Sequence, residues 1–165
     1  PVRNDSRPHA KRGGSRAPRS AGRGSLVRQA ITILVHFPAA AAQIPPAQVD
    51  ALANVGQAGA SILRDLLLEL RADPCKSTGQ VLERWREKPE AEHLSKLAQA
   101  EVLIADLAAA QRELGMLVSK LIEEVVTGRV DELLAKERSE GLNSQEKEEF
   151  QRLILSRSNQ RPVNK

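Results

Sequence analysis

The sequence has few of the residues that build covalent or metal-bound sites. Cys75 is the single cysteine among 165 residues. One cysteine excludes an internal disulfide and any multi-cysteine zinc or iron–sulfur site made by this chain alone. A thiol nucleophile also needs a base and an orienting group, and no local motif around His9, His36 or His93 supplies them. We therefore expect Cys75 to be a loop or core residue, and we expect no metal and no cofactor.

Aromatic residues and long hydrophobic runs are also scarce. The chain has two Phe, one Trp and no Tyr, whereas sites for single-stranded nucleic acid usually stack bases on aromatic side chains along a basic groove. Trp85 lies between Arg84 and Arg86, but a lone Trp on an amphipathic helix is typical of a core. No window reaches the roughly 18 consecutive apolar residues of a membrane-spanning helix, and no signal peptide is recognisable. We expect a soluble, cytosolic protein, and a fragment of a longer one because residue 1 is Pro.

Sequence motifs of the common catalytic sites are missing as well. There is no phosphate-binding loop of the G-x-x-x-x-G-K-S/T type, no G-x-G-x-x-G, no H-E-x-x-H and no G-x-S-x-G. Two carboxylate clusters occur, at 123–124 and 146–149, but on helices such clusters are usually solvated faces. The sequence therefore predicts a binding module rather than an enzyme.

Positive charge is concentrated at the N-terminus. Residues 1–24 hold seven basic residues against Asp5 alone, a charge of +6, which leaves 18 basic and 20 acidic residues in 25–165. A segment rich in Arg, Gly, Ser and Pro cannot bury enough apolar surface to fold. We predict that residues 1–24 form a disordered basic linker. The alternative function is a nucleic-acid-binding helical domain that acts through this tail, whose contact with nucleic acid would be weak and non-specific.

The rest of the chain carries helical patterns throughout. A helix capped by Ser25 should run through LVRQAITILVHF to Pro38, and because it is apolar on nearly all sides it should lie centrally. A connector covers 38–55, an amphipathic helix follows from Gly56 to Arg71, and Ser77 or Thr78 should cap the next helix. Strict two-residue alternation is absent. The predicted class is all-α, with a helical bundle over residues 25–126.

The longest pattern runs from about Glu101 to Glu140. Apolar residues recur there at steps of three and four, which predicts one buried face: Leu103, Leu107, Ala110, Leu114, Leu117 and Leu121. After Val125 the apolar stripe turns to another side of the helix. Gly128 lies at this change and should allow a bend, because Gly has low helix propensity.

The second half of this helix should pair with a final helix. Gly141 is placed to end the first helix, and Asn143 or Ser144 to cap the next. We predict a helical hairpin over 127–158 outside the bundle, followed by a flexible tail at 159–165. The expected hairpin core is Val126, Val130, Leu133, Phe150, Leu153 and Ile154.

Three segments resemble one known family. They are LVRQAITILVHFP, STGQVLERWRE and DELLAKERSEGLNSQEKEEFQRLIL. Each is a weak signal alone, but their order and spacing are specific. Together they resemble the C-terminal helicase-binding domain of the bacterial DnaG-type replicative primase, over residues 25–158.

The resemblance implies a bundle, a long connecting helix and a C-terminal hairpin that docks on the N-terminal domains of the hexameric DnaB-type helicase. It also implies that this contact places primase at the replication fork and modulates the helicase, while the parts that synthesise primers lie elsewhere. Two departures from the family are the small side chains of AAAAQIP and a last helix that ends before Pro162. With the hairpin core satisfied, the residues left for the helicase are Leu134, Arg138, Arg152, Leu155 and Arg157.

Overall fold

The computed structural model describes residues 21–159 as seven α-helices and two short 3-10 helices, with no strand in that range. The all-α prediction is confirmed. The elements are α1 (Ala21–His36), η1 (Pro38–Gln43), α2 (Pro46–Ala51), η2 (Leu52–Asn54), α3 (Ala60–Ala72), α4 (Thr78–Trp85), α5 (Ala91–Ala98), α6 (Leu107–Ser139) and α7 (Ser144–Asn159). None of the helices within 21–159 is long and apolar enough to cross a membrane.

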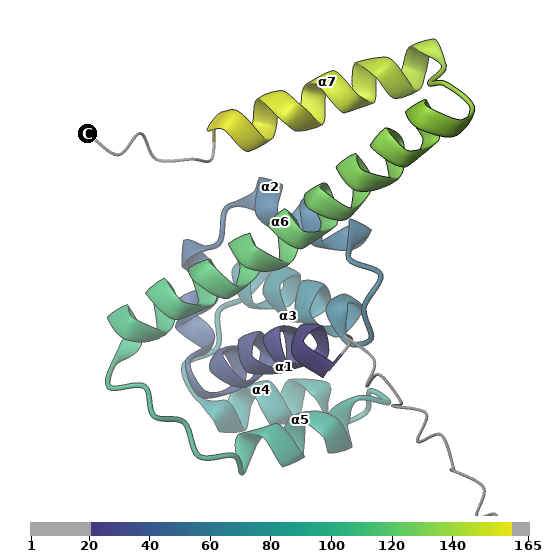
Figure 1. Cartoon of the computed structure of the whole chain (residues 1–165). Coiled ribbons are helices and arrows are strands. Elements are labelled where there is room, and N and C mark those ends of the chain that lie inside the picture. The colour runs from purple at the N-terminus through teal and green to yellow at the C-terminus, as the bar shows by residue number, and fades with distance from the viewer. Residues whose placement is uncertain (1–20, 160–165) are drawn as a thin grey trace, which may run out of the picture.

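Helix α1 is the centre of the bundle (Figure 1). It contacts α3, α4, α5, α6 and η1, which explains why its sequence is apolar on most sides. It begins at Ala21, four residues before the expected Ser25, and ends at His36 because Pro38 disfavours a helical residue before it. The predicted linker over 1–24 thus overlaps the start of α1, and its first 20 residues lie outside the described part of the chain.

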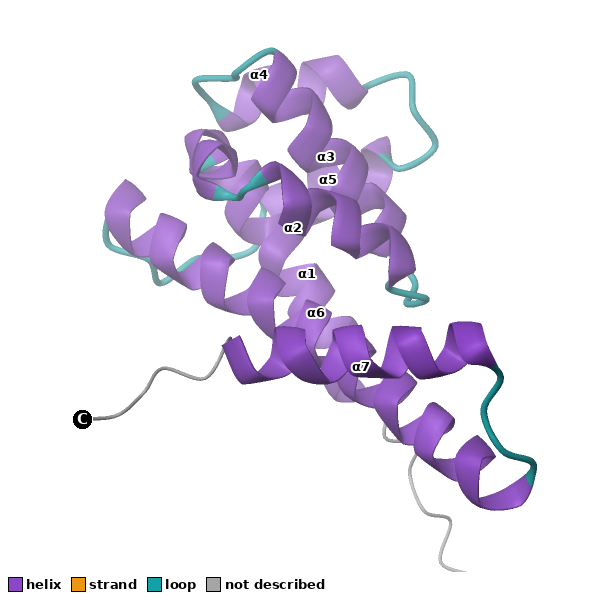
Figure 2. Cartoon of the chain, turned by 90° about the horizontal axis from the view of Figure 1, so that it is seen from above, coloured by secondary structure: helices purple, strands orange, loops and turns teal. Residues whose placement is uncertain are grey.

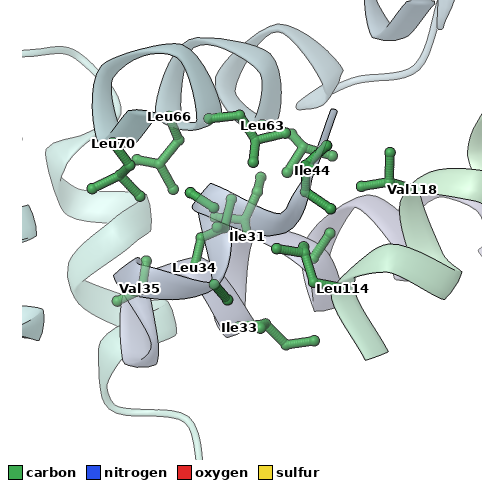
Figure 3. Packing of buried hydrophobic residues seen from close by; sticks show 14 of the residues in the cluster. Ile31, Ile33, Leu34, Val35, Ile44, Leu63, Leu66, Leu70, Leu114 and Val118 are labelled. Atoms are coloured by element: carbon green, nitrogen blue, oxygen red, sulfur yellow. The ribbon is translucent and has the colours of Figure 1, made fainter. Parts of the chain in front are cut away.

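The core joins α1 to α3 on one side and to α6 on the other (Figure 3). Ile31 and Leu34 of α1 are at most 1% exposed and lie between Leu66 of α3 and Leu114 of α6. Ala40 and Ala41 are buried, in the short helix η1 that packs on α6. Small side chains in AAAAQIP therefore allow a close approach of the two elements.

Local chemistry sets the ends of α3 and α4. Gly59 precedes α3 with φ +86°, and an added Cβ would stand 3.3 Å from a methyl group of Val27, so glycine suits this position on two counts. Ser77 caps α4, its side chain accepting a hydrogen bond from the backbone N–H of Gln80 at 3.3 Å, as one of the two predicted caps. Cys75 is buried in the bundle core.

The long helix α6 starts later than predicted. Asp106 caps it by accepting a hydrogen bond from the N–H of Ala109 at 2.7 Å, and its own backbone is extended. Leu103 consequently lies before the helix and is 93% exposed, while Leu107 in the first turn is 40% exposed. The buried stripe of α6 in the bundle is Ala110, Leu114, Leu117, Val118 and Leu121.

Helix α6 continues without interruption past the bundle, and α7 turns back along its outer half (Figures 1 and 2). Gly128 lies inside this continuous helix rather than at a break, and an added Cβ there would meet nothing within 4 Å. The bundle and the hairpin therefore share a single helical connection.

Candidate docking site

The hairpin formed by the outer half of α6 and by α7 has a small core of its own. Val130 and Leu133 on α6 are 2% and 1% exposed, yet neither belongs to the contiguous buried cluster of the bundle. On α6 that cluster extends only to Leu121, with Ile122 and Val125 packed against its edge. The hairpin is thus a separate packing unit on a shared helix.

The turn between α6 and α7 is built from a glycine and a leucine. Gly141 adopts φ +81°, the left-handed conformation expected for the residue after a helix, and its N–H donates to the Lys136 carbonyl at 3.1 Å. Leu142 follows and is 9% exposed. An apolar residue at this position commonly packs back on the last turn of the helix it follows.

Asn143 and Glu146 form a reciprocal cap at the start of α7. The Asn143 side chain accepts from the Glu146 N–H at 2.9 Å, and the Glu146 carboxylate accepts from the Asn143 N–H at 3.0 Å. Lys136 of α6 donates to the other Glu146 oxygen at 2.5 Å. The lysine hydrogen bond and then the backbone hydrogen bond lower the pKa of Glu146. The carboxylate thereby fixes both the turn and the pairing of the helices.

Arg129 and Glu149 lock the hairpin nearer its base. The guanidinium donates from Nε at 2.8 Å and from a terminal nitrogen at 2.9 Å to the two oxygens of Glu149, a bidentate pair between α6 and α7. Glu132 accepts a third hydrogen bond from Arg129 at 3.2 Å. The hydrogen bonds from Arg129 lower the pKa of Glu149 and raise that of Arg129. With Lys136–Glu146, this pair sets the antiparallel register.

The residues predicted for the hairpin core are only partly brought together. Val130 and Leu133 are buried, and Val126, Phe150 and Leu153 are half-buried. Ile154 departs from the expectation, because it is 41% exposed. Leu142, which sequence reasoning missed, is buried instead, and its position directly after Gly141 was the available signal.

The five residues predicted to contact a partner lie along the whole hairpin. Arg138 and Arg152 are exposed, Leu155 is 64% exposed, and Leu134 is half-buried. Because Arg129 pairs with Glu149 and Lys136 with Glu146, Arg138 lies near the turn. Arg157 lies at the base, where it lines a hollow with residues of α2 and α6. The five predicted contact residues therefore do not form one compact cluster.

The hairpin exposes apolar side chains, and the described residues hold no metal-binding cluster. Within 21–159 no three His, Cys, Asp or Glu side chains lie close enough together to hold a metal ion. Apolar side chains exposed on the hairpin are Ile154 and Leu155, on consecutive positions of α7. The hairpin surface therefore combines exposed apolar groups with the exposed cations Arg138 and Arg152.

Comparison with known proteins gives one consistent result. Residues 27–153 match the family described as DNA primase DnaG DnaB-binding. The chain is 32% identical over 126 residues to the DNA primase of Salmonella typhimurium, and 29% identical over the same length to that of Escherichia coli K12. Each alignment covers 76% of this chain and 21% of the relative, so the chain spans about a fifth of the curated primases it matches.

A solved structure agrees with the sequence matches. The C-terminal domain of DnaG primase from Vibrio cholerae superimposes with a TM-score of 0.62 at 30% sequence identity. The superposition covers 79% of this chain and 96% of that domain.

Proposed function

Because the chain belongs to the family of DnaB-binding domains of the primase DnaG, we propose that it docks on the N-terminal domains of a hexameric DnaB-type helicase through the α6–α7 hairpin. The observation that carries this proposal is a hairpin with its own core outside the bundle, which presents apolar side chains on α7. A fold that keeps such a unit apart from its main core leaves the unit's outer surface available to a partner.

The ion pairs make the hairpin suitable for docking because they hold its shape before binding. The Arg129–Glu149 pair and the Lys136–Glu146 pair join α6 to α7 at two levels. A preformed surface loses less conformational entropy on association. Burial of one exposed side chain such as Leu155 would then contribute roughly 1.5 to 3 kcal/mol by area transfer, before ordering costs. Arg138 and Arg152 would steer the encounter and set the register.

The bundle acts as the scaffold in this proposal. Its buried cluster is complete without any residue beyond Val125. The basic segment at the N-terminus would connect it to the rest of a primase. In the parent protein this contact would couple RNA primer synthesis to unwinding at a cytoplasmic replication fork and would modulate the helicase, while the synthesis itself would need residues outside this chain.

Calorimetric titration with the helicase N-terminal domain tests the proposal. Truncation after Thr127 should abolish binding while the bundle keeps its cooperative melt. In the full chain, Ile154→Asp and Leu155→Asp should each weaken binding by about tenfold or more. Leu68→Asp is the matched control, because Leu68 on α3 is 41% exposed, as is Ile154. Normal binding by the truncated chain would overturn the proposal.

A second deletion distinguishes helicase docking from nucleic-acid binding through the basic tail. Removal of residues 1–20 leaves α1 intact, because α1 begins at Ala21. Helicase binding should survive this deletion. A loss of helicase binding with the tail would instead assign the contact to the N-terminus.

A further inference from the structure

A trough runs along the half of α6 that lies in the bundle, beside the buried stripe. One part, about 930 Å³, lies between α6 and the segment from Gln43 to Gln48. A second part, about 460 Å³, continues it to Arg157 at the end of α7. The two share Gln48, Ser119 and Glu123, so they form one depression, here called the α6 trough. From Ala108 to Glu123 it follows α6 for about 22 Å, at 1.5 Å per residue.

An apolar side chain stands between two cations in this trough. Arg112, Met116 and Lys120 are four residues apart, so they share one stripe of α6. Met116 is 67% exposed, the largest exposure of any large apolar side chain within the described helices. Methionine adapts its shape to varied apolar partners. The stripe thus offers one apolar contact with a positive charge about 6 Å to either side.

The charge of the trough is not balanced from within the described chain. Arg112, Lys120 and Arg157 line it against Glu123 as its one carboxylate, and none of the three cations has an ion pair in residues 21–159. Residues 25–165 as a whole contain more acidic than basic side chains, so this local excess of cations is a departure from the average surface. An acidic occupant is therefore complementary.

The first 20 and the last six of these 165 residues do not supply that charge. Residues 1–20 contain six basic residues and only Asp5 as an acid, and residues 160–165 contain Arg161 and Lys165 and no acid. Nucleic acid is a weaker candidate, because the trough lacks aromatic side chains for stacking and its centre is Met116. The complementary charge therefore has to come from outside these 165 residues.

We propose that the α6 trough binds an amphipathic helix of a partner protein that carries carboxylates one turn to either side of an apolar side chain. The apolar residue would cover Met116, and the carboxylates would pair with Arg112 and Lys120. A second helix repeats its side chains at the same four-residue interval, so its ridge can pack beside this stripe. The glutamines along the trough, Gln43, Gln48 and Gln111, can adjust as donors or acceptors to polar groups at its edges. This surface shares only Arg157 with the residues predicted for the helicase, it does not include the exposed Ile154 and Leu155, and its test does not use the helicase.

The experiment uses the full chain labelled with ¹³C at the methionine methyl group. Met116 is the only methionine, so the spectrum contains a single reporter inside the trough. The probe is a synthetic 18-residue alanine-based helix with Glu, Leu and Glu at four-residue intervals on one face. A second probe replaces both Glu residues by Lys. Affinity is followed by fluorescence anisotropy of the same peptides.

The acidic probe should shift the Met116 resonance and bind, and Arg112→Glu with Lys120→Glu should weaken its binding by about tenfold or more. The lysine probe should bind that double variant better than it binds the original chain, because the charges are exchanged. Lys76→Glu with Lys147→Glu is the matched control, since both lysines are exposed outside the trough, and it should leave binding unchanged.

Three results would overturn the proposal. The first is equal affinity of the acidic probe for the original chain and for the Arg112→Glu, Lys120→Glu variant. The second is a Met116 resonance that does not respond to the probe. The third is a Met116 resonance that moves with protein concentration alone, together with a dimer in sedimentation, which would assign the trough to a second copy of this chain.

Discussion

Leu133→Ala and Leu114→Ala should have different consequences although both remove a buried leucine from α6. Leu133 is 1% exposed in the hairpin core and Leu114 is 0% exposed in the bundle core. Replacement of a buried Leu by Ala costs about 2 to 5 kcal/mol, and the cost falls where the surroundings can collapse into the space. The bundle cluster surrounds Leu114 on several sides, whereas the hairpin core has few buried members. We expect about 2 kcal/mol for Leu133 and a larger value for Leu114.

The two substitutions should also destabilise different parts of the chain. Because the hairpin core is separate from the bundle cluster, we expect the hairpin to open while the bundle stays folded, and the Leu133 substitution should act on this local opening of α7. A cost of about 2 kcal/mol corresponds to a roughly 30-fold faster hydrogen exchange of α7 amides. Hydrogen exchange by mass spectrometry, with denaturant unfolding of the same samples, measures both effects. The reasoning would be refuted if Leu133→Ala lowered the global midpoint as much as Leu114→Ala and left α7 exchange unchanged.

Two further substitutions test the shared helix and the ion pairs. Gly128→Ala should raise the free energy of unfolding by about 0.5 to 1 kcal/mol in denaturant titration, because Ala has the higher helix propensity and an added Cβ meets nothing within 4 Å. Gly115→Ala is the comparison, because an added Cβ there also meets nothing within 4 Å. The pKa values of Glu146 and Glu149 are lowered below the ordinary 4.5, so their contribution to hairpin stability is present above that pH and is lost as the pH falls through the lowered values. Exchange protection of α7, corrected for intrinsic rates, should therefore drop in acid, and Glu149→Gln should make the drop smaller. An acid response unchanged by Glu149→Gln would show that the pair with Arg129 does not stabilise the hairpin.

Features governed by nearby residues could be predicted from the sequence. Leu114, Leu117 and Leu121 recur at helical spacing, and all three are buried in the bundle. Ser77 and Gly141 were placed at helix ends because a cap needs a side-chain acceptor and a left-handed turn needs glycine. These are properties of a few consecutive residues, so the rest of the fold does not have to be known.

The start of α6 shows where periodicity misleads. Leu103 continues the spacing of the leucine stripe, and the pattern alone therefore placed it in the helix. The side chain of Asp106 instead satisfies the N–H of Ala109, which fixes the first turn after Leu103. A cap competes with an apolar pattern, and a single apolar residue beyond it does not extend the helix.

Contacts that depend on the relative position of two elements could not be predicted. The Arg129–Glu149 pair joins residues 20 positions apart, and it follows only from the register of the finished hairpin. The same register leaves Ile154 partly exposed and buries Leu142. The α6 trough depends on how the segment around Gln43 and Gln48 lies beside α6, and the sequence contains no local sign of that arrangement.

The footprint of the helicase on this chain tests the central claim most directly. Hydrogen exchange of the full chain should be measured with and without the helicase N-terminal domain at saturating concentration. The hairpin proposal predicts slower exchange in the outer half of α6 and in α7, with the bundle helices α3, α4 and α5 unchanged. Protection confined to the bundle helices, with the hairpin unchanged, would contradict it.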